Sequence, residues 1–260
     1  MELITSKLIS VPHGFPTRAG GVSTGPYASL NSGLNTGDDR EKVEANLKLF
    51  AEAAGVEPSR LFTVSQVHGD TVLEVRDVAP ASALRPPLGE ADALFTARPF
   101  DAVGVKTADC LPILLCDPQG RRVAAVHAGW RGTLARIVER ALEAMAKQGT
   151  RVADVRAAVG PAIQGCCYEV APDLAEKFER AFGASVVVVG DKPRLKLAEA
   201  VRLSMEKVGV PPAQIELRVE CTSCDGRFYS HRRDKGVTGR HLSFIAHRFE
   251  QPRGRPATTL

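Results

Sequence analysis

The most apolar part of this chain lies in its middle and has the pattern of buried strands. Apolar residues dominate three segments, 103–110, 111–116 and 123–127. Such runs are typical of strands that are covered on both faces, as in layered sheets. The first two segments are interrupted at Thr107 to Cys110, and the third ends on His127 before the turn residues Gly129 and Gly132.

Two other segments have the spacing of amphipathic helices. Within residues 39–54, apolar side chains recur every three or four positions, and Gly55 follows where a helix would end. A second helix is predicted after His127, with Thr133 as its N-cap. Its apolar face contains Leu134, Ile137, Val138, Ala141, Leu142 and Met145.

The remaining elements interleave strands and helices without strict alternation. Residues 61–68 alternate like a strand that ends on His68, and residues 228–234 and 242–246 resemble a closing hairpin. No internal repeat or long linker separates two cores. The pattern therefore predicts a single α/β domain over residues 1–250, with layered architecture and mixed sheets, followed by a disordered tail over residues 251–260.

Composition and charge exclude several classes of protein. The chain is 44% hydrophobic and 25% charged, as in ordinary soluble domains. Its net charge of +4 arises from 34 basic and 30 acidic residues, too small an excess to predict a nucleic-acid partner. No stretch has the ~20 apolar residues of a membrane helix, and the amino terminus lacks the pattern of a signal peptide. We therefore expect a cytoplasmic protein with no membrane partner.

Candidate chemistry gathers where predicted strands end. His68, Cys110 and His127 each close an apolar segment at a turn, and strand ends on one side of a sheet converge in space. Two imidazoles and a thiolate suit zinc, and three protein ligands leave the fourth tetrahedral position open, as in catalytic sites. The residues themselves also allow each side chain to be an ordinary core residue.

The same residues fit a second chemistry. Cys110 could be a thiolate nucleophile activated by His127, with Asp109 or Asp70 orienting the imidazole.

Cations near these residues are candidates for holding an anion. Arg18, Lys106 and Arg131 could bind a phosphate or carboxylate, although each could equally be a surface cation. The position of Arg131 at a predicted helix start supports an anion-binding role for this residue, because the N–H groups there favour an anion.

The other cysteines give a weaker signal. Cys221 and Cys224 have the spacing of a metal or redox pair. Their potential partners Cys166 and Cys167 are adjacent, so in a strand their side chains would point to opposite faces. We therefore interpret these four as small hydrophobic core residues, with a four-cysteine zinc site and a redox pair as alternatives.

Seven ordered motifs between His13 and Ala246 together resemble the YfiH/YlmD-type family, which is labelled variously as laccase-domain polyphenol oxidase, peptidoglycan editing factor and purine nucleoside phosphorylase. The motifs are Thr17-Arg-x-Gly-Gly-Val-Ser23, Leu34-Asn-x-Gly-Asp38, Ser65-Gln-Val-His-Gly-Asp70, Lys106-Thr-Ala-Asp-Cys110, Val126-His-Ala-Gly-Trp-Arg-Gly132, Cys167-Tyr-Glu-Val170 and Arg232-Arg-Asp with Thr238-Gly-Arg240.

The resemblance implies a layered α-β-β-α domain with a zinc site made of His68, Cys110 and His127. It implies phosphorolysis of adenosine, inosine, guanosine and methylthioadenosine, and hydrolytic deamination of adenosine. For phosphorolysis, Arg18 and Arg131 are the predicted phosphate contacts, and Asn35 is predicted to meet the ribose hydroxyls.

Two alternative activities accompany this prediction. The first is a Cys110–His127 hydrolase or amidase acting on peptidoglycan precursors. The second is copper-dependent polyphenol oxidation in the same site. A multicopper oxidase needs many imidazoles, commonly in His-x-His pairs, and the six histidines of this chain form no such pair.

Overall fold

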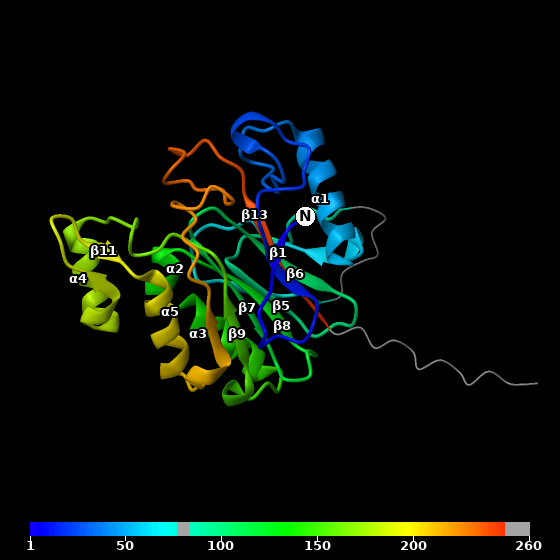
Figure 1. The fold of residues 1–260 in the computed structure, drawn as a ribbon. Coiled ribbons are helices and arrows are strands. Elements are labelled where there is room, and N and C mark those ends of the chain that lie inside the picture. The colour runs from blue at the N-terminus through cyan, green and yellow to red at the C-terminus, as the bar shows by residue number, and fades with distance from the viewer. Residues whose placement is uncertain (77–83, 248–260) are drawn as a thin grey trace, which may run out of the picture.

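Two β-sheets packed face to face form the centre of the molecule, for which a computed structural model describes residues 1–76 and 84–247 (Figure 1). The five-stranded sheet has the order β1 (Leu3–Ile4), β2 (His13–Pro16), β13 (His241–Ala246), β6 (Ala102–Thr107) and β3 (Leu61–Phe62). The six-stranded sheet has the order β12 (Ile215–Leu217), β9 (Arg156–Val159), β7 (Leu111–Cys116), β8 (Val123–Ala128), β5 (Ala93–Thr96) and β4 (Val72–Glu74). Both sheets are mixed, because β3–β6, β4–β5 and β9–β12 are parallel while the other pairs are antiparallel.

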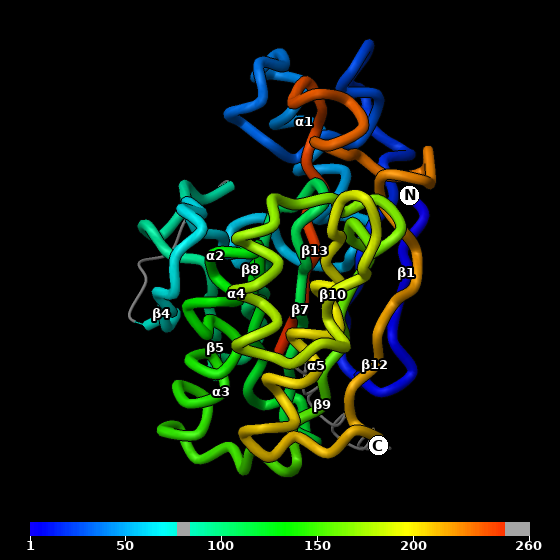
Figure 2. The backbone as a smooth tube through the Cα atoms, turned by 90° about the vertical axis from the view of Figure 1, so that its left-hand side faces the viewer, coloured from blue at the N-terminus to red at the C-terminus, as the bar shows by residue number. Residues whose placement is uncertain are grey.

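Helices cover the outer faces of both sheets. On the five-stranded sheet lies α1 (Arg40–Ala54), and on the six-stranded sheet lie α3 (Ile137–Lys147) and α5 (Leu197–Lys207), as Figures 1 and 2 show from two sides. The short α2 (Trp130–Leu134), α4 (Pro172–Phe182) and the small pair β10 (Val187–Val188) and β11 (Arg194–Leu195) pack beside α5. The predicted layered α-β-β-α architecture with mixed sheets is confirmed.

The continuous apolar runs of the sequence are explained by these four layers. Along β8, Val123 and Ala125 face the other sheet, while Ala124 and Val126 face the helices. Both faces of the strand are therefore buried, and alternation along the strand directs His127 toward the space between the sheets. That placement sets the position of the site described below.

Helix α1 begins and ends where the sequence predicted. The Asp39 side chain accepts a hydrogen bond from the N–H of Glu41, and Gly55 adopts the left-handed conformation after the last turn. Its buried face of Val43, Leu47 and Phe50 packs against β6 and β13.

Two predictions at the candidate site were wrong in detail. The strand predicted over 61–68 ends at Phe62, and His68 lies in a bend with φ of 61°. Thr133 is not an N-cap, because α2 already begins after Gly129 and the Thr133 hydroxyl donates to the Gly129 carbonyl inside the helix. A left-handed Arg136 then separates α2 from α3.

The predicted closing hairpin was also wrong in part. Residues 241–246 form β13, but residues 228–234 form turns rather than a strand, and β13 pairs with β2 and β6. The predicted tail over 251–260 lies outside the described residues, and the single domain over 1–250 stays a prediction. Among the described helices, none is long and apolar enough to cross a membrane.

Candidate functional site

A cavity of about 700 Å³ opens at the edge where β6, β7 and β8 meet their flanking loops. This volume lies within the usual range for small-molecule sites. Its wall combines the predicted metal ligands with polar and charged side chains: Asn35, Gln66, His68, Lys106, Asp109, Cys110, His127, Tyr168, His231, Arg232 and Arg240.

The three side chains predicted to bind a metal meet in this wall. The ligand atoms of His68, Cys110 and His127 all lie within 4.8 Å of one another. The two imidazole rings are 4.9 Å apart and nearly perpendicular, at 79°. A Cβ atom at Gly129 would lie 3.1 Å from both Cys110 Sγ and His68 Cδ2, so glycine permits this close approach and any larger residue would make the two ligands shift.

A buried carboxylate that the sequence analysis missed organises the two histidines. Asp92 is fully buried and accepts a hydrogen bond from Nδ1 of His127 at 2.7 Å. It also accepts the N–H groups of Val67, His68 and Gly69 at 3.2, 3.0 and 2.6 Å, which holds the left-handed bend at His68. With Nδ1 donating to Asp92, Nε2 of His127 is free to bind a metal.

Electrostatics at the site favour a thiolate. Burial alone would raise the pKa of the Cys110 thiol, but the charge and hydrogen bond of His127, helped by His68, lower it to about 6. Burial lowers the pKa of His127, whereas the Cys110 charge and the Asp92 hydrogen bond raise it more strongly. Burial likewise raises the pKa of Asp92, but its bonds to His127 and Gly69 hold it below the ordinary value. Cys110 is therefore suited both to metal binding and to nucleophilic attack.

The donor set fits a metal ion with one open position. Two imidazoles and one thiolate are zinc ligands, and Asp92 supplies the carboxylate–histidine contact that commonly orients such imidazoles. Among residues 1–76 and 84–247, one other group of side chains could hold a metal, and it contains only cysteines.

Neither carboxylate predicted to orient His127 does so. Asp70 forms an ion pair with Arg140 at 2.8 Å. Asp109 has a left-handed backbone, with φ of 89°, and its carboxylate accepts hydrogen bonds from the Thr222 hydroxyl and the Arg232 backbone N–H, each at 2.6 Å. Asp109 thus fixes the backbone that precedes Cys110. One sequence signal could have identified the orienting residue, namely a lone Asp92 within an apolar strand segment.

Of the three cations predicted to hold an anion, one lines the cavity. Arg18 and Arg131 do not line it: the Arg18 guanidinium stacks 4.8 Å from the Tyr229 ring centre, and that of Arg131 stacks 4.6 Å from Trp130. Lys106, which the sequence had suggested as an anion contact, does line the cavity.

Lys106 is held in position by its backbone, which leaves its ammonium free. Its N–H donates to Gln66 Oε1 and its carbonyl accepts from Gln66 Nε2, both at 2.7 Å. No hydrogen bond or ion pair joins its ammonium to another side chain in the described part of the chain. Burial lowers the pKa of this ammonium. A half-buried cation without a counter-charge favours an anionic ligand.

The remaining cysteines contradict the hydrophobic-core interpretation. The Sγ atoms of Cys166, Cys167, Cys221 and Cys224 all lie within 4.8 Å of one another, and only Cys221 is buried. Adjacent cysteines can converge here because residues 165–167 form a turn rather than a strand.

A three-ligand candidate metal centre lines a cavity of small-molecule size in this layered α/β protein, which is the organisation of an enzyme active site. A family model described as multi-copper polyphenol oxidoreductase laccase matches residues 12–248. The chain is 41% identical to a protein of Deinococcus radiodurans named purine nucleoside phosphorylase, over 94% of this chain and 92% of that protein. It is 39% identical to purine nucleoside phosphorylase YfiH of Escherichia coli K12, over 88% and 90% of the two chains.

Solved structures agree with these relatives. The crystal structure of YlmD from Geobacillus stearothermophilus superimposes with a TM-score of 0.86 at 32% identity, covering 94% of each chain. That of YfiH from Bacillus licheniformis gives 0.85 at 34% identity, covering 91% of this chain and 92% of the other. The chain belongs to the YfiH/YlmD family, whose family model carries the laccase description.

Proposed function

We propose that this protein is a zinc-dependent purine nucleoside phosphorylase that also deaminates adenosine. The substrates we propose are adenosine, inosine, guanosine and methylthioadenosine, with phosphate as the second substrate. The observation that carries the proposal is the convergence of His68, Cys110 and His127 beside the free ammonium of Lys106 in one cavity. The names of the relatives support the choice of reaction.

Phosphorolysis joins a phosphate oxygen to C1′ of the ribose while the bond from C1′ to the purine breaks. Lys106 and Arg240 line the cavity, and we assign the phosphate to them. The lowered pKa of Lys106 limits this role to the pH range in which the ammonium stays protonated. Asn35 is assigned to the ribose hydroxyls, as the sequence had suggested.

The departing purine needs its developing negative charge neutralised. Tyr168 lines the cavity, and burial, with the nearby Cys110 charge, raises the pKa of its hydroxyl to about 12. The hydroxyl is therefore protonated and able to donate a hydrogen bond to the base. The Arg232 guanidinium lies 5.5 Å from the Tyr168 ring centre and limits the movement of that ring.

Zinc held by the two histidines and Cys110 would supply Lewis-acid chemistry and would bring the pKa of water to ~7, as deamination of adenosine requires. Asp92 keeps the His127 proton on Nδ1, away from the metal side of the ring. Copper in the same donor set, which would allow oxidation of phenols, is an alternative. The family model's description as a multi-copper oxidoreductase is consistent with copper binding. Against a multicopper enzyme, only one candidate metal group among the described residues contains histidine.

A second candidate function rests on the same geometry. Cys110, His127 and Asp92 form a chain of a thiol, an imidazole and a carboxylate, and the pKa of Cys110 is lowered to about 6. This is the arrangement of a nucleophilic hydrolase or amidase, for which peptidoglycan precursors are the proposed substrates.

Incubation of inosine with purified protein, with and without phosphate, tests the proposal. We expect hypoxanthine and ribose 1-phosphate only when phosphate is present, and neither product from Cys110→Ala. Trapping of Cys110 by a thiol-alkylating reagent with loss of amidase turnover, in protein that releases no base, would instead support the hydrolase.

A further inference from the structure

Four cysteines meet outside the cavity, and the proposed reaction uses none of them. Cys166 and Cys167 lie in the turn between β9 and α4, and Cys221 and Cys224 lie in the turns that follow β12. Cys224 Sγ lies 3.6 Å from Cys166 Sγ and 3.2 Å from Cys167 Sγ. The cluster therefore joins two segments that are more than fifty residues apart in sequence.

The distances between these sulfur atoms match those around one metal ion. Tetrahedral zinc binds thiolates at ~2.3 Å, which places the sulfur atoms ~3.8 Å from one another. All four Sγ atoms here lie within 4.8 Å of each other, so small side-chain rotations would complete the tetrahedron. We propose that Cys166, Cys167, Cys221 and Cys224 bind a second zinc ion, at a closed structural site distinct from the open centre in the cavity.

The surroundings of the four cysteines favour a negatively charged zinc–thiolate group. Four thiolates around Zn²⁺ carry a net charge of −2. The Gln164 N–H donates to Cys221 Sγ at 3.4 Å. The guanidinium groups of Arg194 and Arg232 donate to the carbonyls of Cys166 and Cys167 at 3.4 and 3.3 Å. The Gln164 contact orients a metal-bound thiolate, and the two guanidinium groups place positive charge on the backbone beside the cluster.

The alternatives to zinc fit less well. The Sγ atoms of Cys167 and Cys224 are 3.2 Å apart, well beyond the ~2.05 Å of a disulfide bond. A disulfide would also use only two of the four converging side chains. The interior-hydrophobe interpretation fails because Cys166 and Cys224 are exposed.

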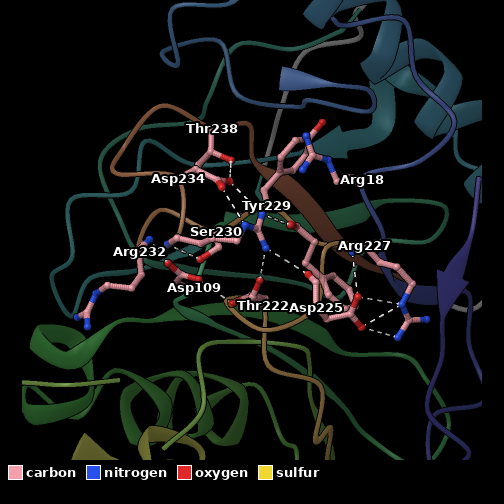
Figure 3. Close-up of polar contacts among 12 residues, drawn as sticks. Arg18, Asp109, Thr222, Asp225, Arg227, Tyr229, Ser230, Arg232, Asp234 and Thr238 are labelled. Carbon is pink, nitrogen blue, oxygen red and sulfur yellow. Dashed lines mark hydrogen bonds and ion pairs between the residues drawn. The ribbon is translucent and has the colours of Figure 1, made fainter. Parts of the chain in front are cut away.

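The second zinc would reinforce the wall of the cavity. Thr222, next to Cys221, and the backbone of Arg232 hold the Asp109 carboxylate from both sides, as Figure 3 shows. Asp109 in turn precedes Cys110, and the Asp109 carbonyl accepts the N–H of Ile163 from the segment that leads to the first cysteine pair. Zinc that joins the two cysteine-bearing segments would therefore restrict movement of the backbone that positions Cys110.

Metal content per chain tests this inference independently of catalysis. The full-length protein, purified from zinc-supplemented medium, is analysed by mass spectrometry of the elements beside three variants. Cys166→Ser with Cys224→Ser changes two exposed ligands, Cys110→Ala removes the cavity centre, and Cys116→Ala is a buried cysteine outside both groups.

We expect two zinc ions in the wild type and in Cys116→Ala, and one in each of the other variants. X-ray absorption of Cys110→Ala should show a first shell of sulfur only. If the cavity centre binds no zinc, the wild type and Cys110→Ala should each hold one ion and the double variant none, which separates failure of the proposed function from failure of this inference.

Three results would overturn the second site. One is a double variant that folds and keeps the zinc content of the wild type. Another is a disulfide between Cys167 and Cys224 in peptide maps of the freshly purified, metal-free protein. The third is nitrogen or oxygen in the first shell of the zinc in a Cys110→Ala sample. Iron in place of zinc in the wild-type protein, a result that does not depend on any variant folding, would count equally against the site.

Discussion

Replacement of Asp92 by asparagine tests whether one buried carboxylate organises the metal centre. Oδ1 of Asp92 accepts hydrogen bonds from His127 Nδ1 and the His68 N–H, and Oδ2 accepts from the N–H groups of Val67 and Gly69. Asparagine has the same shape but only one acceptor oxygen. If that oxygen faces His127, the amide NH₂ is directed at the two N–H donors of Val67 and Gly69.

The cost follows from these contacts. A fully buried donor left without a partner costs about 1–3 kcal/mol. Because Val67 is exposed and Gly69 is half-buried, water replaces part of the lost hydrogen bonds, and we expect the two donors together to destabilise the fold by roughly 1–3 kcal/mol. Loss of the carboxylate behind a metal-binding histidine lowers metal affinity about 10–100-fold. Both effects act on His68 and His127, because the backbone bonds hold the former and the Nδ1 bond orients the latter.

Competition with a zinc chelator and urea unfolding measure the two effects separately. Asp70→Asn is the matched control, because Asp70 lies near the site but forms an ion pair with Arg140 at the surface. We expect the control to bind zinc like the wild type. Asp92→Asn that binds zinc with wild-type affinity, in a fold of wild-type stability, would refute the reasoning.

Three further predictions concern the cavity and its supports. Lys106→Met should raise the KM for phosphate at least tenfold in steady-state kinetics, and an unchanged KM would remove Lys106 from the phosphate site. Because burial lowers the pKa of Lys106, the KM of the wild type should begin to rise at a lower pH than it would with an exposed lysine. Gly129→Ala should lower zinc affinity by about tenfold or more, because the added Cβ lies 3.1 Å from two ligands. The change adds no backbone strain, since φ of Gly129 is −79°, and unchanged zinc binding in a chelator titration would contradict the prediction. His241 is buried and neutral, with its pKa lowered to about 3 mainly by burial, so below pH 6.5 the unfolded chain binds a proton that the folded chain does not. The free energy of unfolding should therefore fall by about 1.4 kcal/mol per pH unit through this residue as the pH drops from 6.5 toward 3, and urea titrations of His241→Gln that show the same pH slope as the wild type would disprove its role.

Much of the fold follows from local patterns in the sequence. The helical spacing of residues 39–54 and the glycine at 55 predict α1 without tertiary information, and the structure adds the cap at Asp39. The continuous apolar runs of β7 and of β8 up to His127 predict strands covered on both faces, as the four layers require. His127 could be placed from its strand alone.

Features that depend on long-range contacts could not be predicted in this way. His68 reaches the site on a left-handed bend that Asp92 stabilises from 24 residues away, so an alternating pattern suggested a strand instead. Arg18 occurs in a glycine-rich motif that favoured a ligand, but its guanidinium stacks on Tyr229, whose position depends on the far end of the chain. The four-cysteine cluster was only an alternative in the sequence analysis, because Cys166 and Cys167 were placed in a strand, whereas a turn carries them.

The most direct test of the proposed function is reconstitution of the metal-free protein with zinc. Phosphate-dependent release of hypoxanthine from inosine is followed while zinc is added to the Cys166→Ser/Cys224→Ser variant, whose only remaining candidate metal centre among the described residues is that of the cavity. We predict that activity rises linearly and saturates at one zinc ion per chain, and that His127→Ala stays inactive throughout. Full phosphorolysis by the metal-free protein, or saturating zinc binding without any release of base, would contradict the account.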